Sequence, residues 1–171
     1  YVHSLEPDAL TVGEAWDITA EAAKYVGDQV DLVFEFNLAG AILSALWRGD
    51  NQALVEAQQA ALDLFPAAQY AAFLTNHDQN RVMNQLRDDV GRAKAAATLL
   101  LTNPGMPFIY YGEEIGMRGA KPDERIRTPM QWDGTAAAGF TTGQPWEDLS
   151  TGFEEVNVAA QTGDPTSLLS H

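Results

Sequence analysis

Polar side chains, most of them acidic, stand at three separate points of the sequence, each after a short apolar run. These residues are Glu14, then Asn76, His77 and Asp78, and then Glu113 and Glu114. Two separated carboxylates at one site can hydrolyse a glycosidic bond, with one as the acid and the other as the nucleophile or base. The same groups could bind a divalent metal instead. The residues alone therefore favour a glycosidase only modestly over a metal enzyme.

The elements that must position these groups follow from the hydrophobic pattern. Four short apolar runs without alternation predict buried strands at Leu10–Val12, Asp31–Phe36, Ala71–Leu74 and Phe108–Tyr111. Helical composition or spacing lies between or beside them at Ile18–Tyr25, Asn37–Trp47, Asn51–Phe65 and Asp88–Leu101. Strands that alternate with helices predict a parallel α/β sheet. The polar groups then meet at one edge, because the carboxyl ends of parallel strands share it.

The last third of the sequence has a different character. Residues 116–156 show no convincing periodicity and are rich in Gly, Pro, Thr and Asp, which predicts a long loop after the last strand. Further on, Asp164 and Pro165 are typical of a helix start that continues toward His171.

Composition narrows the function classes. The chain has 171 residues, enough for one domain, and no apolar run of about 18 residues that would span a membrane. Its net charge of −14 disfavours nucleic acid and anionic membranes as partners, and suits a neutral substrate or a solvated acidic surface. With no cysteine in the sequence, a disulfide and a thiolate metal site are both excluded.

Four stretches, in this order, resemble the α-amylase family, glycoside hydrolase family 13. They are TVGEAWD (Thr11–Asp17), AFLTNHDQNR (Ala72–Arg81), LLLTNPGMPFIYYGEEIGM (Leu99–Met117) and RIRTPMQWD (Arg125–Asp133). The last of them, with AGFTTGQPW (Ala138–Trp146) after it, is similar to oligo-α-glucosidases and to enzymes intermediate between these and α-amylases. The resemblance covers nearly the whole chain.

The resemblance implies an α/β fold: the C-terminal half of a (β/α)8 TIM barrel, strands 5 to 8 with their helices, truncated at both ends. Residues 1–171 would be a partial catalytic domain. The N-terminal half barrel and the C-terminal β-sandwich domain are expected to be absent from the chain. The missing half barrel, or a second copy bound through exposed sheet edges, would then be a partner.

The resemblance also assigns roles in a retaining hydrolysis of α-glucosidic bonds. Glu14 would be the general acid/base, Asp78 would hold two ring hydroxyls of the sugar, and His77 would bond to the same sugar. Trp16 could stack on a sugar or pack in the core, and Arg81 could orient the carboxylates or serve only as an ion-pair partner. Packing or loop-structure roles are expected for Tyr110, Tyr111, Glu113, Glu114, Arg127, Gln131 and Trp132.

The family nucleophile lies in an Arg-x-Asp motif on the fourth strand, and no such motif precedes Glu14. We therefore expect the isolated chain to be inactive, because a retaining enzyme needs its nucleophile. No cofactor is expected in these residues, although many family members bind calcium in a domain inserted after the third strand. The expected substrate is an α-glucan or a maltooligosaccharide.

Other functions stay open at this point. A transglycosylase or isomerase of the same family, such as a trehalose synthase, would use the same acid and the same His-Asp pair. Some relatives have lost catalysis and serve as scaffolds, but they usually lose the carboxylates that stand here at Glu14 and Asp78. The sequence does not decide between α-1,4 and α-1,6 bonds.

Overall fold

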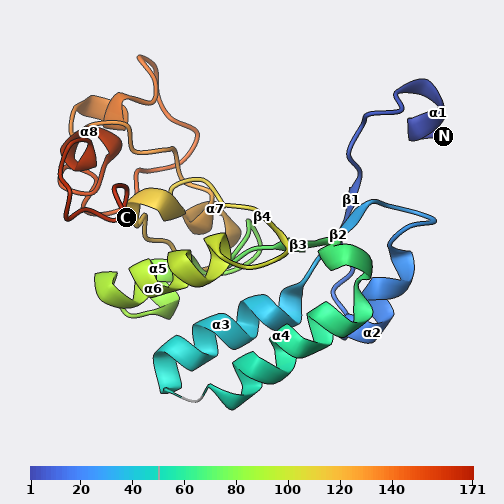
Figure 1. Cartoon of the computed structure of the whole chain (residues 1–171). Coiled ribbons are helices and arrows are strands. Elements are labelled where there is room, and N and C mark those ends of the chain that lie inside the picture. The colour runs from blue at the N-terminus through green and yellow to red at the C-terminus, as the bar shows by residue number, and fades with distance from the viewer. Residues whose placement is uncertain (50) are drawn as a thin grey trace.

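The computed structural model describes residues 1–49 and 51–171 and contains one four-stranded parallel sheet. Its strands are β1 (Val12–Gly13), β2 (Leu32–Phe34), β3 (Tyr70–Ala72) and β4 (Met106–Pro107), and they lie side by side in chain order (Figure 1). Every neighbouring pair is parallel, with Val12 opposite Leu32, Val33 opposite Tyr70 and Ala71 opposite Met106. The predicted parallel α/β sheet is confirmed.

Helices occupy most of the connections. They are α1 (Val2–Leu5), α2 (Thr19–Ala22), α3 (Phe36–Arg48), α4 (Gln52–Leu64), α5 (Val82–Gln85), α6 (Val90–Leu101), α7 (Asp123–Ile126) and α8 (Val158–Gln161). Short 3-10 turns lie at Ala23–Tyr25, Pro66–Ala68, Glu113–Ile115 and Ala136–Gly139. Among the described residues, no helix is long and apolar enough to cross a membrane.

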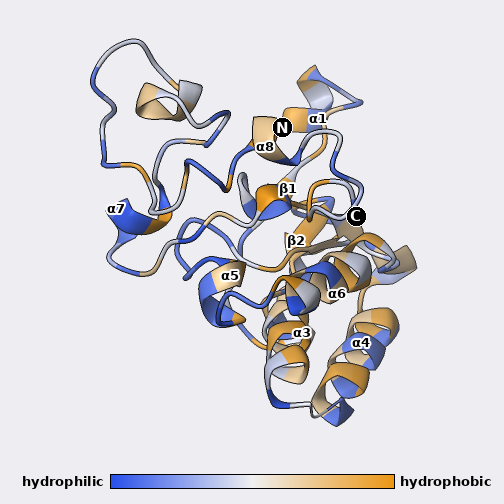
Figure 2. Cartoon of the chain, turned by 90° about the vertical axis from the view of Figure 1, so that its left-hand side faces the viewer, coloured by the Kyte–Doolittle hydropathy of each residue, from blue (hydrophilic) through white to orange (hydrophobic). Residues whose placement is uncertain are grey.

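The three long helices, α3, α4 and α6, lie on one side of the sheet in both views (Figures 1 and 2). Their apolar stripes and the strand side chains form the main core, in which Leu38 and Ile42 of α3 are each 1% exposed and Tyr70 of β3 is 0% exposed. Burying one large aliphatic side chain contributes about 1.5–3 kcal/mol. This packing fixes the position of the sheet, and therefore of the strand ends that Glu14 and the segment Asn76–Asp78 follow.

The long helices begin and end close to the predicted boundaries, for local reasons. Glu35 caps α3 by accepting hydrogen bonds from the backbone N–H groups of Asn37 and Leu38 at 3.1 and 3.2 Å. Gly49 ends the same helix in the left-handed region at a φ of 76°. Asp89 caps α6 by accepting from the backbone N–H of Arg92 at 3.0 Å.

The strand boundaries need correction. The predicted strand Phe108–Tyr111 is wrong in position, because the paired residues are Met106–Pro107 and the last ladder bond runs from the Phe108 N–H to the Ala72 oxygen at 2.7 Å. After Ala72 and Phe108 the two segments enter separate loops, so the hydrogen-bond ladder between them does not continue. The other three strands are also shorter than predicted.

Two expectations for the last third of the chain also change. The loop 116–156 contains α7, which is mostly hydrophilic in Figure 2, and one 3-10 turn. The predicted helix at Asp164 does not form, and residues 163–171 make turns instead. The Asp164 carboxylate accepts from both the N–H and the hydroxyl of Thr166 at 2.8 Å, and this local bond stabilises a turn.

Candidate active site

Glu14 directly follows β1 and is exposed to solvent at the carboxyl edge of the sheet. It lines a surface hollow together with Trp16, Asp17, Tyr25 and Gln29. A carboxylate in this setting can exchange protons with a bound ligand or with water.

Trp16 lies beside Glu14, and only part of its ring is packed against the protein; stacking on a sugar stays a prediction. Its ring stacks on the Phe36 ring, with centroids 4.7 Å apart and an interplanar angle of 15°. The residue is nevertheless 65% exposed, so part of the indole remains open to solvent. The stack fixes the orientation of the ring, and the open part provides an apolar surface next to the carboxylate of Glu14.

His77 and Asp78 lie in the loop that follows β3. The His77 Nε2 atom is 3.6 Å from Asp78 Oδ2, and the two side chains are 53% and 37% exposed. The backbone N–H of Asp78 donates to Asn76 Oδ1 at 2.9 Å, which fixes the turn. Imidazole and carboxylate therefore face solvent together, and both can hydrogen-bond to hydroxyl groups.

Arg127, from the loop after β4, donates hydrogen bonds to both residues of this pair. Its Nη2 donates to Asp78 Oδ1 at 2.7 Å, and its Nε donates to the His77 carbonyl oxygen at 2.9 Å. The Nη2 also donates to Asp123 Oδ2 at 2.9 Å. The sequence prediction treated Arg127 as part of the loop structure and did not link it to Asp78. The only sequence signal for a role of Arg127 at the site was its position within the RIRTPMQWD stretch.

Arg81 has different surroundings from those of the other predicted site residues. It is 0% exposed, and its guanidinium lies 4.6 and 4.7 Å from the ring centroids of Tyr110 and Tyr111. Its Nη1 donates to the Tyr111 carbonyl oxygen at 2.6 Å. Among residues 1–49 and 51–171, no ion pair joins it to a carboxylate. In this structure Arg81 organises the segment after β4, and a role in orienting the carboxylates around a substrate stays a prediction.

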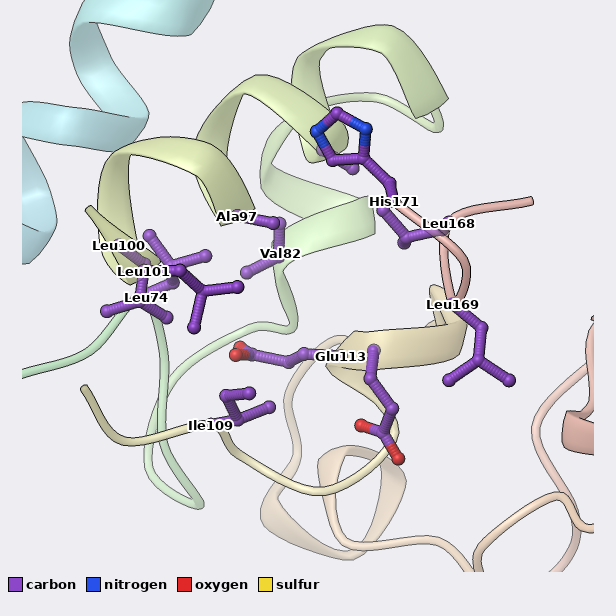
Figure 3. Close-up of a pocket in the computed structure, with 12 residues that line it drawn as sticks. Leu74, Val82, Ala97, Leu100, Leu101, Ile109, Glu113, Leu168, Leu169 and His171 are labelled. Atoms are coloured by element: carbon purple, nitrogen blue, oxygen red, sulfur yellow. The ribbon is translucent and has the colours of Figure 1, made fainter. Parts of the chain in front are cut away.

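Glu113 projects into an apolar cavity of about 180 Å³ that Leu74, Leu101 and Ile109 also line (Figure 3). Burial raises its pKa to about 8, against the opposing effects of the Thr75 hydroxyl, which donates to Glu113 Oε1, and of the Arg81 charge. At pH 7 this group is therefore mostly a neutral acid. Burial likewise raises the pKa of Tyr110 to about 12.

Glu35, at the carboxyl end of β2, was not singled out from the sequence. It is 1% exposed, accepts from the Thr19 hydroxyl at 3.0 Å and caps α3. Burial raises the pKa of its carboxyl group, and its Oε2 has no hydrogen-bond partner among the described residues. The sequence signal for Glu35 was an acidic residue placed between a predicted strand and a predicted helix. In the structure, Glu35 has a structural role as the cap of α3.

The site thus has two parts on one edge of the sheet. Asp78, His77 and Arg127 are in contact, whereas Glu14 follows β1, which β2 separates from β3. Among residues 1–49 and 51–171, no hydrogen bond or ion pair joins Glu14 to Asp78. This arrangement can donate a proton at one point and bind hydroxyl groups at the other.

Comparison with known proteins decides the family. The family described as the alpha amylase catalytic domain matches residues 1–171, the whole chain. The chain belongs to the α-amylase family. It is 33% identical over 175 residues to Alpha-amylase 3 of Dictyoglomus thermophilum, and 32% identical over 216 residues to an oligo-1,6-glucosidase of Halalkalibacterium halodurans.

Solved structures of the α-amylase family agree with this assignment. The α-amylase from H. orenii superimposes with a TM-score of 0.89 at 37% identity over 99% of this chain. The chain spans 35% of that structure, and 35% and 38% of the two sequence relatives. The four parallel strands are therefore part of an α-amylase catalytic domain of the TIM-barrel type.

Residues 1–49 and 51–171 contain no group of three or more His, Asp or Glu side chains that could hold an ion.

Proposed function

We propose that this chain supplies the acid catalyst and the sugar-binding His-Asp pair of a retaining glycoside hydrolase that acts on α-glucosidic bonds of starch-derived oligosaccharides. Its four strands would be strands 5 to 8 of the barrel. The observation that carries the proposal is that two groups of side chains lie on the same edge of the sheet. An exposed Glu14 follows β1, and His77 and Asp78, the latter bound by Arg127, follow β3.

Glu14 is the proposed general acid/base. It donates its proton to the glycosidic oxygen as the bond from the anomeric carbon to that oxygen breaks, and later it takes a proton from the attacking water. Its exposure supports this role, because the carboxyl group must lose and regain a proton in each cycle. The Trp16 ring beside it offers an apolar surface to a sugar.

Asp78 and His77 are the proposed anchors of the sugar ring at which the bond breaks. Hydrogen bonds from two ring hydroxyls to the Asp78 carboxylate strengthen as the ring flattens toward an oxocarbenium-like transition state. The bond from Arg127 supports this role because it fixes one carboxylate oxygen and leaves the half-exposed group open to hydroxyl donors.

A Glu14→Gln substitution tests the proposal. Gln keeps the shape but has no proton to give, so kcat on maltooligosaccharides should fall by about 10²–10⁴-fold. The measurement is the release of reducing ends by the protein in which these 171 residues occur. The exposed Glu155→Gln variant is the matched control and should keep full activity. Unchanged turnover after Glu14→Gln would overturn the assignment.

A second candidate is transglycosylation or isomerisation with the same residues. The fold also resembles that of the isomaltulose synthase from Protaminobacter rubrum, with a TM-score of 0.75 at 25% identity over 95% of this chain. Which acceptor reaches the sugar decides between the two reactions. Chromatography of the products from maltotriose separates them: glucose and maltose indicate hydrolysis, whereas longer or isomeric oligosaccharides indicate transfer.

A further inference from the structure

We propose that the segment Glu35–Asn37, at the carboxyl end of β2 and the start of α3, positions the acid/base Glu14 for proton transfer. Glu14 follows β1, the strand beside β2, and begins a stretch that we call the acid loop, residues 14–19. This inference rests on the proposed function, which gives Glu14 its role. The residues of the segment are positioning residues, because they act on the acid through the loop that carries it.

Hydrogen bonds join the segment to the far end of the acid loop. The Asn37 side-chain amide donates to the Asp17 carbonyl oxygen at 2.9 Å and to the Thr19 hydroxyl oxygen at 3.4 Å. The Thr19 hydroxyl in turn donates to Glu35 Oε1 at 3.0 Å. Because the same oxygen caps α3, the acid loop and the helix share one anchor.

An aromatic contact holds the middle of the acid loop. Trp16 stacks on Phe36, and Phe36 packs edge-on against Phe73, with ring centroids 4.9 Å apart. Phe36 is 6% exposed and Phe73, directly after β3, is 2% exposed, so neither ring can move without disturbing the core. The acid loop is thereby connected, through Phe36, to the segment that leads to His77 and Asp78.

The burial of Glu35 supports a role beyond capping. A carboxylate can cap a helix while it stays in solvent, as the exposed Asp89 does for α6. Glu35 is instead 1% exposed, and burying a carboxyl group is costly unless hydrogen bonds compensate. One of those bonds comes from Thr19, at the end of the acid loop. The loop and the buried carboxyl group therefore stabilise each other.

The acid loop is short enough to pass this restraint on to Glu14. Only Ala15 and Trp16 separate Glu14 from Asp17, and the Asp17 N–H donates to the Ala15 carbonyl oxygen at 2.9 Å. A tight turn of this kind leaves little freedom between the held residues and the acid. Since proton transfer needs hydrogen-bond reach and the right direction, a small displacement of Glu14 slows it.

The test compares phenyl and 2,4-dinitrophenyl α-maltosides as substrates of the protein in which these 171 residues occur. Phenolate leaves poorly and needs the proton, whereas dinitrophenolate departs as an anion without it. Thr19→Val and Asn37→Ala should lower kcat/KM about tenfold on the phenyl substrate and change it less than about twofold on the other. Thr19→Ser keeps the hydroxyl and should restore the ratio. A variant that is merely destabilised loses the same factor on both substrates.

Two further variants keep the conclusions apart. Asp89→Ala removes the cap of α6, and it should leave both rates unchanged. Glu14→Gln should show the same selective loss on the phenyl substrate, and if it does not, the acid assignment and the proposed function fail. If Glu14→Gln is selective while Thr19→Val and Asn37→Ala lose equally on both substrates, or lose nothing, the positioning role alone is wrong.

Amide hydrogen exchange gives a second readout that does not depend on turnover. Residues 14–19 should exchange faster in Thr19→Val and in Asn37→Ala, because their bonds to the segment Glu35–Asn37 are lost. Asp89→Ala should leave exchange in these residues unchanged. Unchanged exchange in both loop variants would overturn the positioning role whatever the kinetics show.

Discussion

At the scale of single residues, Asp78 is defined by a contact that spans 49 positions of the chain. Arg127 binds its carboxylate and also the His77 carbonyl oxygen, so one guanidinium fixes both the side chain of Asp78 and the backbone of His77, the pair proposed to bind the sugar. Both ion-pair partners are 37% exposed, so solvent weakens the pair and it adds little to folding stability. Its main effect is on the orientation of Asp78.

Arg127→Met should therefore affect catalysis more than stability. Without the guanidinium, Asp78 is free to rotate, and a loss of orientation of this kind costs about 10- to 100-fold in kcat/KM on maltooligosaccharides. Arg127→Lys should recover only part of the loss, because an ammonium group cannot reach Asp78 and His77 in the same fork. Steady-state kinetics and the melting temperature are the two readouts. Equal kcat/KM in the Met variant and the unsubstituted protein would contradict the orienting role.

At the scale of elements, the backbone just before β4 packs against the ring of Tyr70, whose position is fixed by hydrogen bonds. Tyr70 of β3 is 0% exposed, and its hydroxyl donates to Asn103 Oδ1 at 2.5 Å and accepts from Gln58 Nε2 at 3.2 Å. Gly105, just before β4, faces this ring so closely that a Cβ atom there would lie 2.3 Å from Tyr70 Cε2. The close approach of backbone to ring requires glycine at this position.

Gly105→Ala should destabilise the fold by about 1–3 kcal/mol, because a methyl group forces either the bonded ring or β4 to move. Gly40→Ala is a matched control. Gly40 lies inside α3, and a Cβ atom there would meet nothing within 4 Å. That change should stabilise the helix by about 0.5–1 kcal/mol. Urea unfolding measures both, and a neutral Gly105→Ala would show that the Tyr70 ring yields easily.

At the scale of the whole molecule, one buried acid makes folding depend on pH. The pKa of Glu113 is raised to about 8 in the folded state from an ordinary value of 4.5. Between these two values the unfolded chain releases a proton that the folded chain keeps. The stabilising contribution of the protonated group is therefore complete below about pH 4.5 and is lost as pH rises toward 8.

Glu113→Gln should remove this pH dependence, because the amide stays neutral at every pH. Its stability relative to the unsubstituted protein should rise between pH 5 and pH 8 by a few kcal/mol, at about 1.4 kcal/mol for each pKa unit. Urea unfolding at the two pH values provides the measurement, with the exposed Glu155→Gln as control. If the difference in unfolding free energy between the variant and the unsubstituted protein does not change with pH, then the pKa of Glu113 is not raised in the folded protein.

The sequence by itself determined the order of the four strands and of the three long helices, the parallel sheet and the edge at which Glu14, His77 and Asp78 emerge. Each of these depends on local information: apolar runs of strand length, helical composition or spacing, and the rule that parallel strands end on one side. The motifs at Glu14 and at His77–Asp78 likewise occupy short contiguous stretches.

Only the tertiary structure decided where the strands end, that Arg81 is buried and that Arg127 holds Asp78. These features depend on contacts between segments far apart in the chain. The Arg127 contact comes from residues 116–156, which have no periodicity from which a partner could be inferred. Local patterns fix the elements, whereas the contacts of a long loop are fixed only when the rest of the fold brings its partners within reach.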